Sequence, residues 1–384
     1  MSMNLRLCKV TLVVLLATAL GGCSWLSDLN PFGPSTPKMA PLPTFTPTAE
    51  LRTDWSGSVG GAGGYVFQPA VVGTAVYAAG RDGTVARFDE GRQVWKINTE
   101  RKLSAGVGAN ARLALVVSEK GEVIALDAES GAVKWQTPIN AEVLAPPAIG
   151  DSVVIVRTSD NRLIGLDPTD GQRKWLYQRS NPPLALRNFT PVVMEGGVGL
   201  AGFPGGKLVA VNPGNGGALF ELTVASPKGA TELERVADVS GPPVVRGQEI
   251  CAVAYQGRIA CFDGSNGNSL WSREFSSSVG MDRDNRQVYV VDDKDAVNAL
   301  DGSTGASIWK QDKFARRALT RPVAFGSYVA AGDREGYVHV FQREDGALAA
   351  RARPDSSAVS AVKAYGRGIV VQTQAGGVYA LSAQ

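Results

Sequence analysis

Short apolar runs, each bounded by Asp and Gly, recur along the chain from about residue 70 to the C-terminus. In the clearest copy, the apolar run 123–126 is followed by Asp127, Gly131 and Trp135. Runs of four to eight apolar or alternating residues that end at turn residues predict β-strands, and no stretch keeps the 3.6-residue period of an amphipathic helix. The pattern therefore predicts an all-β protein made of a repeated unit.

Each copy of the unit predicts four strands. Asp82-Gly83 lies between two apolar runs and is typical of a type I′ hairpin, because both central residues of that turn need a positive φ. The Asp-x-x-x-Gly that follows is a second turn, after which a third strand carries the Trp. The segment before each copy supplies the fourth strand and often opens with proline, as at Pro69, Pro147, Pro191, Pro243 and Pro322. Four strands in about 40–45 residues are typical of a propeller blade.

The position of the repeated Trp indicates the number of blades. It is occupied in turn by Trp95, Trp135, Trp175, Phe220, Trp271, Trp309 and Ala350, so the spacing stays close to that of a blade. An eighth copy, 377–381, ends before its Trp-bearing strand, and the segment 51–55 has no partner of its own. Joining the two would remove an open sheet edge. We therefore predict an eight-bladed β-propeller of four-stranded antiparallel blades over residues 51–384, its ring closed by an N-terminal strand.

The N-terminus is typical of a signal peptide. Arg6 and Lys9 precede an apolar stretch, 10–20, that is too short to span a bilayer as a finished helix. We therefore expect residues 1–22 to be a leader that is removed.

A lipid attachment site follows the leader. The sequence from Leu20 to Cys23 resembles the lipobox of bacterial lipoproteins, so Cys23 is the expected lipidated N-terminus; the alternative is an ordinary secretory leader with a chance cysteine. Ser24, in place of Asp, indicates transit to the outer membrane of a Gram-negative bacterium, with the protein on the periplasmic side. Residues 23–50 are rich in proline and poor in large apolar groups, so we expect a lipidated N-terminus and a semi-extended tether.

Charge and cysteine usage narrow the class of protein. The net charge is +3, and removing the two basic residues of the leader leaves 37 basic against 36 acidic residues, which does not favour a nucleic-acid partner. Cys251 and Cys261 flank the turn at Gln256-Gly257. A three-residue loop would place them opposite each other, whereas a two-residue loop would offset them by one. A disulfide, which a periplasmic compartment permits, and two buried thiols both remain open.

Groups that enzymes use are scarce. His339 is the single histidine and lies in a predicted strand, where we expect a satisfied or surface side chain. No Ser-His-Asp set, metal-spaced His/Cys cluster or Gly-rich phosphate loop can be assembled. The repeated Asp and Trp residues recur once per blade, so we interpret them as turn and packing residues. The sequence predicts no catalytic residue, no metal and no cofactor.

The repeated Ala-Leu-Asp-x-x-x-Gly-x-x-x-Trp phrase resembles the repeat of pyrroloquinoline-quinone-type propellers. The quinone dehydrogenases of that superfamily are longer and carry a vicinal Cys-Cys disulfide and a central calcium site, neither of which is visible here. Over essentially its whole length, the chain is similar instead to the BamB family of outer-membrane assembly lipoproteins. The more specific markers of this resemblance are Leu184-Ala-Leu186-Arg187, the segment 231–239 and the segment 319–338.

The resemblance implies a partner-binding site. In the BamB family a Leu-x-Leu-Arg segment and an Asp-x-Asp segment contact the POTRA domains of the barrel-forming subunit BamA. The first is Leu184, Leu186 and Arg187 here, and of the second only Asp238 carries over, because Ser240 replaces the other Asp. Both segments lie in the two longest intervals between repeats, and insertions in repeat proteins tend to map to one working face. The alternative is that the two leucines are buried beneath their loop.

Two functions from different classes follow. The first is a non-catalytic scaffold of the β-barrel assembly (BAM) complex, which binds BamA and other subunits at the outer membrane and assists the insertion of barrel proteins. We also expect that an extended segment of an unfolded outer membrane protein can pair with an exposed strand edge of the ring, by β-augmentation. The second is a site for a quinone or other small molecule in the channel of the ring, as in a dehydrogenase.

Overall fold

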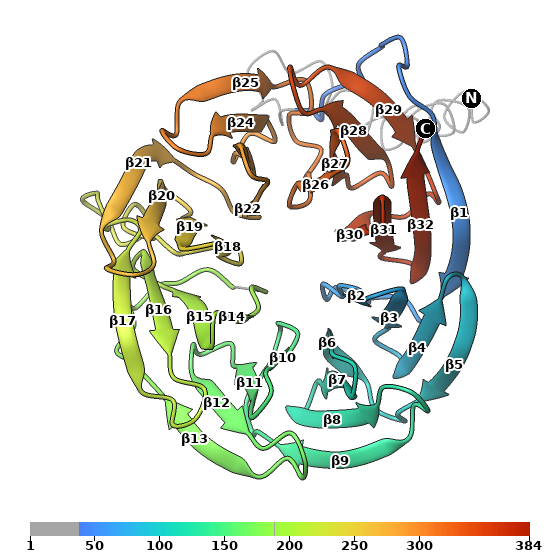
Figure 1. The fold of residues 1–384 in the computed structure, drawn as a ribbon, viewed down its shortest axis with the longest axis vertical. Coiled ribbons are helices and arrows are strands. Elements are labelled where there is room, and N and C mark those ends of the chain that lie inside the picture. The colour runs from blue at the N-terminus through green and yellow to red at the C-terminus, as the bar shows by residue number, and fades with distance from the viewer. Residues whose placement is uncertain (1–37, 188) are drawn as a thin grey trace, which may run out of the picture. The chain divides into compact units, whose positions relative to one another are not determined.

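The computed structural model describes residues 38–187 and 189–384, and this part of the chain is all-β. Residues 40–384 form a compact unit in which eight four-stranded antiparallel sheets surround a central axis (Figure 1). In each sheet one strand lies next to the axis and the fourth lies at the outer rim (Figure 1). The predicted eight-bladed β-propeller is therefore confirmed.

The first four blades each use four consecutive strands. Blade 1 contains β2 (Ala70–Val72), β3 (Ala75–Ala79), β4 (Thr84–Asp89) and β5 (Arg92–Asn98). Blade 2 contains β6 (Leu103–Ala109), β7 (Leu113–Ser118), β8 (Glu122–Asp127) and β9 (Val133–Pro138). Blade 3 contains β10 (Ala148–Ile149), β11 (Val154–Arg157), β12 (Leu163–Leu166) and β13 (Arg173–Tyr177). Blade 4 contains β14 (Val193–Glu195), β15 (Val198–Phe203), β16 (Lys207–Val211) and β17 (Ala218–Thr223).

The next three blades repeat this arrangement, and the eighth combines both ends of the chain. Blade 5 contains β18 (Val244–Arg246), β19 (Glu249–Val253), β20 (Gly257–Asp263) and β21 (Ser269–Phe275). Blade 6 contains β22 (Met281–Arg283), β23 (Gln287–Val291), β24 (Val297–Asp301) and β25 (Ser307–Gln311). Blade 7 contains β26 (Val323–Phe325), β27 (Tyr328–Gly332), β28 (Val338–Gln342) and β29 (Leu348–Ala352). Blade 8 contains β30 (Val359–Tyr365), β31 (Gly368–Thr373), β32 (Gly377–Ala383) and β1 (Leu51–Ser58).

The N-terminal strand closes the ring. In blade 8 the strand order is β1-β32-β31-β30, with Leu51 opposite Ala383. The same strand supplies Trp55, whose ring lies 5.7 Å from that of Phe88 in blade 1, measured between centroids. The segment expected to complete the eighth blade does so, and it brings the Trp that the eighth repeat lacks.

Five of the repeated Trp residues form a hydrogen bond to the next blade at the rim, whereas the indole N–H of Trp55 has no partner among the described residues. In each of the five, the indole N–H donates, over 2.8–3.1 Å, to a backbone carbonyl in the turn that follows the next blade's third strand. The pairs are Trp95 to Ala128, Trp135 to Pro168, Trp175 to Pro213, Trp271 to Gly302 and Trp309 to Arg343. The indole N–H would otherwise be buried without a hydrogen-bond partner, and the carbonyl of the next blade supplies one. We call this contact the Trp latch.

The Asp and Gly of the repeat shape the turn that receives the latch. Asp127 accepts hydrogen bonds from the backbone N–H and the hydroxyl of Ser130, each at 2.9 Å. The Gly has a positive φ and lies against the Trp of the preceding blade: a Cβ added to Gly305 would lie 2.4 Å from Trp271 Cε3. The whole Asp-x-x-x-Gly-x-x-x-Trp phrase therefore describes one structural contact, repeated around the rim.

Residues 40–50, which we call the strap, lie along blade 7. The backbone N–H groups of Thr48 and Ala49 donate to the carbonyl of Ala349, and Arg351 donates to the carbonyl of Pro43 at 2.9 Å. Ala49 also packs on the apolar cluster of blades 7 and 8. The sequence suggested a tether up to residue 50. The strap instead docks on the ring, through backbone hydrogen bonds that composition does not reveal and through Phe45, whose ring centroid lies 5.0 Å from the Arg351 guanidinium.

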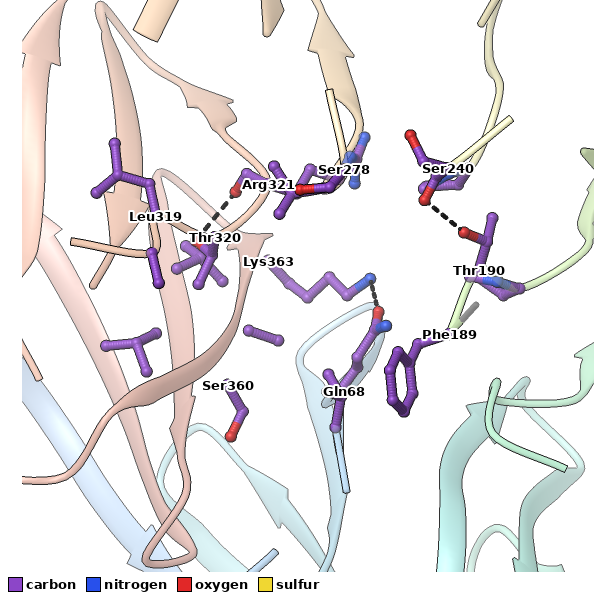
Figure 2. A pocket seen from close by; sticks show the side chains of 18 of the residues that line it. Gln68, Phe189, Thr190, Ser240, Ser278, Leu319, Thr320, Arg321, Ser360 and Lys363 are labelled. Atoms are coloured by element: carbon purple, nitrogen blue, oxygen red, sulfur yellow. Dashed lines mark hydrogen bonds between the residues drawn. The ribbon is translucent and has the colours of Figure 1, made fainter. Parts of the chain in front are cut away.

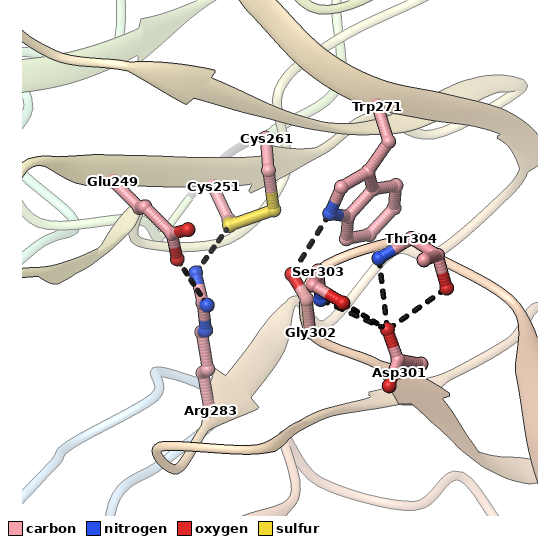
Figure 3. The surroundings of a disulfide bond; sticks show 9 residues. All are labelled: Glu249, Cys251, Cys261, Trp271, Arg283, Asp301, Gly302, Ser303 and Thr304. Carbon is pink, nitrogen blue, oxygen red and sulfur yellow. Dashed lines mark hydrogen bonds and ion pairs between the residues drawn. A yellow bond between two sulfur atoms is a disulfide. The ribbon is translucent and has the colours of Figure 1, made fainter.

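The two cysteines of blade 5 are joined by a disulfide (Figure 3). Cys251 and Cys261 lie opposite each other on β19 and β20, with Cα atoms 4.0 Å apart. The Ala254 N–H donates to the Arg258 carbonyl, so the loop is the three-residue alternative. Arg283 of blade 6 donates to Cys251 Sγ at 3.3 Å (Figure 3), so the disulfide lies in the packing between blades 5 and 6.

Candidate partner-binding site on the connector face

The connectors between blades lie at one end of the ring, beside the hairpins that join the second and third strands of each blade. Backbone bonds fix this arrangement, for example from Glu119 N to Lys102 O and from Ser159 N to Glu142 O, each at 2.8 Å. We call this end the connector face; its connectors are 59–69, 99–102, 139–147, 178–192, 224–243, 276–280, 312–322 and 353–358. The two longest, 178–192 and 224–243, contain all four residues that the resemblance assigns to partner binding.

Asp238 ties these two connectors together. Its Oδ2 accepts a hydrogen bond from the backbone N–H of Leu186 at 2.6 Å, and its Oδ1 accepts one from the N–H of Gly205 at 3.3 Å. The residue is only 2% exposed. Burial raises the pKa of the Asp238 carboxyl, while the two N–H groups and the nearby Arg157 oppose that rise. The structure thus places Asp238 beneath the connector, where it orients Leu186, and not on the surface.

Arg157 is a second buried charge under the same connector, and sequence reasoning missed it. Its guanidinium donates to Asn161 Oδ1 at 2.9 Å and to the Thr190 carbonyl at 3.5 Å. Burial lowers the pKa of Arg157 to about 10, whereas Asp238 favours its charged form. Asp238 therefore anchors the connector backbone at Leu186, and Arg157 anchors it at Thr190.

The two leucines of this connector lie in different surroundings, and Leu184 precedes the anchored Leu186 by two residues. Leu184 is 42% exposed, whereas Leu186 is half-buried and lines the central cavity of the ring. Arg187 forms an exposed ion pair with Glu142 at 2.8 Å, and its guanidinium lies 5.9 Å from the ring centroid of Phe189. Neither leucine is fully buried beneath the loop, so both remain accessible from the connector face or from the cavity.

Ser240, which stands where the family has its second Asp, is buried between connectors. Its hydroxyl donates to the Ser277 carbonyl, and its own carbonyl accepts the Thr190 hydroxyl at 2.7 Å. Ser240 lies in connector 224–243, and these two bonds reach the neighbouring connectors 276–280 and 178–192. Ser240 therefore joins connectors to one another.

A cavity of about 300 Å³ opens beside this site along the axis of the ring. Leu186, Arg187 and Phe189 form part of its wall, and β30 contributes Lys363 (Figure 2). Sequence reasoning could not locate this cavity, because its lining comes from innermost strands and connectors of several different blades.

The remaining sequence-predicted residues lie elsewhere. His339 is fully buried; its Nε2 lies 2.9 Å from an Asp333 oxygen and its Nδ1 accepts from Arg351 at 3.2 Å, so it is a satisfied core residue. Burial lowers its pKa, against the opposing effect of Asp333. Among residues 38–187 and 189–384, no three His, Cys, Asp or Glu side chains are grouped so as to hold a metal ion. Cys23 lies outside the described residues.

Comparisons with known proteins decide the family. A family model described as outer membrane protein assembly factor BamB matches residues 81–311 and 296–384. The outer membrane protein assembly factor BamB of Bordetella pertussis is 42% identical over 359 residues, which cover 92% of each chain. The chain belongs to the BamB family. In the part of this family member that the structure describes, no helix is long and apolar enough to cross a membrane.

Solved structures agree with this assignment. The crystal structure of BamB from Moraxella catarrhalis superposes with a TM-score of 0.80 at 26% identity, covering 86% of this chain and 99% of that one. The quinohemoprotein alcohol dehydrogenase of Comamonas testosteroni gives a TM-score of 0.67 at 12% identity, covering 86% of this chain and 76% of that one. At that identity the second likeness shows the propeller fold alone, so membership of the BamB family carries the functional argument.

Proposed function

We propose that this chain is a non-catalytic scaffold of the outer-membrane β-barrel assembly machine. Its connector face binds the POTRA domains of BamA, and the bound ring helps that machine to insert barrel proteins into the outer membrane. Membership of the BamB family supports the assembly role. The observation that carries the binding site is that two buried charges, Asp238 and Arg157, hold one connector in a fixed shape.

The proposed interface gives a separate role to each residue. Leu184 is the exposed apolar anchor, and Arg187 offers a planar set of donors to a carboxylate of the partner. Leu186 supports the loop from the cavity side. Asp238 is a positioning residue that fixes the Leu186 backbone, so it does not itself contact BamA. A preformed loop loses little conformational freedom on binding, which favours affinity.

A titration of BamA's periplasmic POTRA domains against the full-length chain in detergent tests this interface. Leu184→Ala with Leu186→Ala, or Arg187→Glu alone, should each weaken binding about 30-fold, because truncations of interface anchors typically cost about 2 kcal/mol or more. Leu219→Ala with Leu270→Ala is the matched control, since these leucines are 52% and 47% exposed at the outer rim. The interface is elsewhere if the rim pair weakens binding as much as the connector pair does.

We further propose that lipid on Cys23 holds the ring at the periplasmic side of the outer membrane. The segment from Cys23 to Ala40, fully extended, reaches at most about 60 Å. The Ala40 N–H donates to the carbonyl of Ala315, which belongs to a connector, so the strap begins on the same face as the proposed interface. In cells lacking BamA, Cys23→Ser should leave a folded ring that no longer fractionates with outer membrane; retention there would contradict the lipid anchor.

A further inference from the structure

The axis of the ring contains a half-buried lysine that neither the fold nor the proposed interface explains. Two cavities, of about 300 and about 400 Å³, lie along the axis, and Lys363 lines both of them. Its side chain extends from β30 toward Gln68 and donates to Gln68 Oε1 at 3.0 Å (Figure 2). Gln68 lines both cavities as well, so this pair marks the place where they adjoin.

Lys363 has no carboxylate partner among the described residues. Its ammonium group has three donors, and the bond to Gln68 uses one of them. The charged groups that act on it are Arg321 and Asp282, which are already paired with each other at 3.0 Å. Removal of the ammonium group from bulk water lowers the pKa of Lys363 to about 8. Charges inside proteins are normally paired, so an unpaired cation beside a cavity indicates room for an anion.

The walls of the smaller cavity, of about 300 Å³, indicate what kind of anion fits. Leu186, Phe189 and Val279 are partly exposed and make much of its wall apolar; Figure 2 shows Phe189 beside Gln68 and Lys363. Ser360 lines the same cavity, and its buried hydroxyl oxygen has no hydrogen-bond partner within the described part of the chain. At roughly 30 Å³ for each water-sized group, the volume admits a ligand of about ten non-hydrogen atoms.

We propose that this cavity binds a small monocarboxylate with an apolar body, whose carboxylate pairs with Lys363 and whose body lies against Phe189. Two other cations line the cavity, Arg187 and Arg321, but each is already paired with a carboxylate, Glu142 and Asp282 respectively. Lys363 is the lining cation without such a partner among the described residues, so a single negative charge balances it. The site requires neither a metal nor a quinone, and it does not depend on the proposed binding of BamA.

Calorimetric titration of the full-length chain with 3-phenylpropionate tests the site, with 3-phenylpropanamide as the neutral control of the same shape. We expect a Kd of about 1 mM or lower for the acid and no measurable binding of the amide. Lys363→Met keeps an unbranched apolar stem but removes the charge, and it should weaken binding about 30-fold or more. Lys310→Met is the matched control, because the Lys310 side chain is 51% exposed on an outer strand, and it should leave binding unchanged.

The opposing interpretation is that Lys363 only braces Gln68 between blades 8 and 1. The proposal fails if the wild-type chain binds acid and amide equally or binds neither, or if Lys363→Met keeps the affinity. Should the Met variant fail to fold, Lys363→Gln provides the same comparison. N-acetylalanine, as the free acid or the amide, is small enough for the cavity and mimics the C-terminal end of a peptide chain, so it separates two sources of the carboxylate. Tighter binding of its free acid than of 3-phenylpropionate assigns the site to chain ends, and weaker binding assigns it to free acids.

Discussion

The outer rim and the connector face of this ring are built on different principles. At the rim one contact, the Trp latch, recurs between neighbouring blades with the same donor and the same kind of acceptor. On the connector face, by contrast, the anchors differ from one connector to another: buried Asp238 and Arg157 hold the backbone at Leu186 and Thr190, whereas connector 312–322 is held by the buried pair Arg317–Asp333. The comparison teaches that the repeat supplies stability, whereas departure from the repeat supplies a surface that one partner can recognise.

The largest effect should come from opening the rim. Removing residues 24–58 takes away the strap, β1 and Trp55, and leaves β32 with an unpaired edge. Loss of one large aromatic typically costs about 3–5 kcal/mol, and the strand's ladder bonds add to this, so we expect a loss of at least about 5 kcal/mol in urea unfolding. A chain lacking only residues 24–39 is the control; equal unfolding midpoints would show that β1 does not stabilise the ring.

A single methyl group should disturb one latch. Gly305 and Gly267 have nearly the same positive φ, 71° and 75°, so alanine strains the backbone equally at both. An added Cβ would lie 2.4 Å from Trp271 at the first position but 3.3 Å from Leu222 at the second, because blade 4 has Phe220 in place of Trp. Gly305→Ala should therefore cost about 1–3 kcal/mol more than Gly267→Ala in urea unfolding. Equal costs would mean that the glycine serves only the turn.

The rim could be predicted from sequence because its contacts repeat. The spacing of the Trp positions predicted eight blades, and the incomplete last copy indicated that residues 51–55 close the ring. The strap could not be predicted, because Pro43 and its neighbours contribute backbone carbonyls, which leave no pattern in the side chains. Ala350, which stands at a Trp position of the repeat, belongs to the same apolar cluster as Ala49 of the strap.

The candidate site was predictable only in part. The family resemblance located Leu184 and Asp238, but it could not tell an exposed anchor from a buried support. Arg157 belongs to blade 3 and lies far from Asp238 along the chain, and its own neighbourhood carries no marker of a site. Only the closed ring brings both charges beneath one connector, so this part of the site had to come from the structure.

Loosening the connector should affect binding more than stability. Asp238→Ala leaves the Leu186 N–H without its acceptor and Arg157 without a nearby negative charge, and we expect about 2 kcal/mol of lost stability. Binding of POTRA domains should fall about tenfold or more even at temperatures where the variant is fully folded, because the loop is no longer preformed. Ser240→Ala keeps the backbone bond to Thr190 and should bind within about threefold of the wild type. Normal binding by folded Asp238→Ala would show that the connector needs no such support.

The smallest effect concerns the charge in one rim turn. The N–H and hydroxyl of Ser130, together with Lys134, lower the pKa of Asp127 to about 2. Because this folded-state value lies below the ordinary one near 3.8, the ionised Asp127 contributes stability that is present above about pH 4 and is lost as the pH falls through about 2. Asp127→Asn should therefore be less stable than the wild type at pH 5, by less than either rim change above, and the gap should narrow at pH 2.5. We would measure urea midpoints at both pH values; a gap that stays constant would mean that the side chain acts through its shape and hydrogen bonds, and not through its charge.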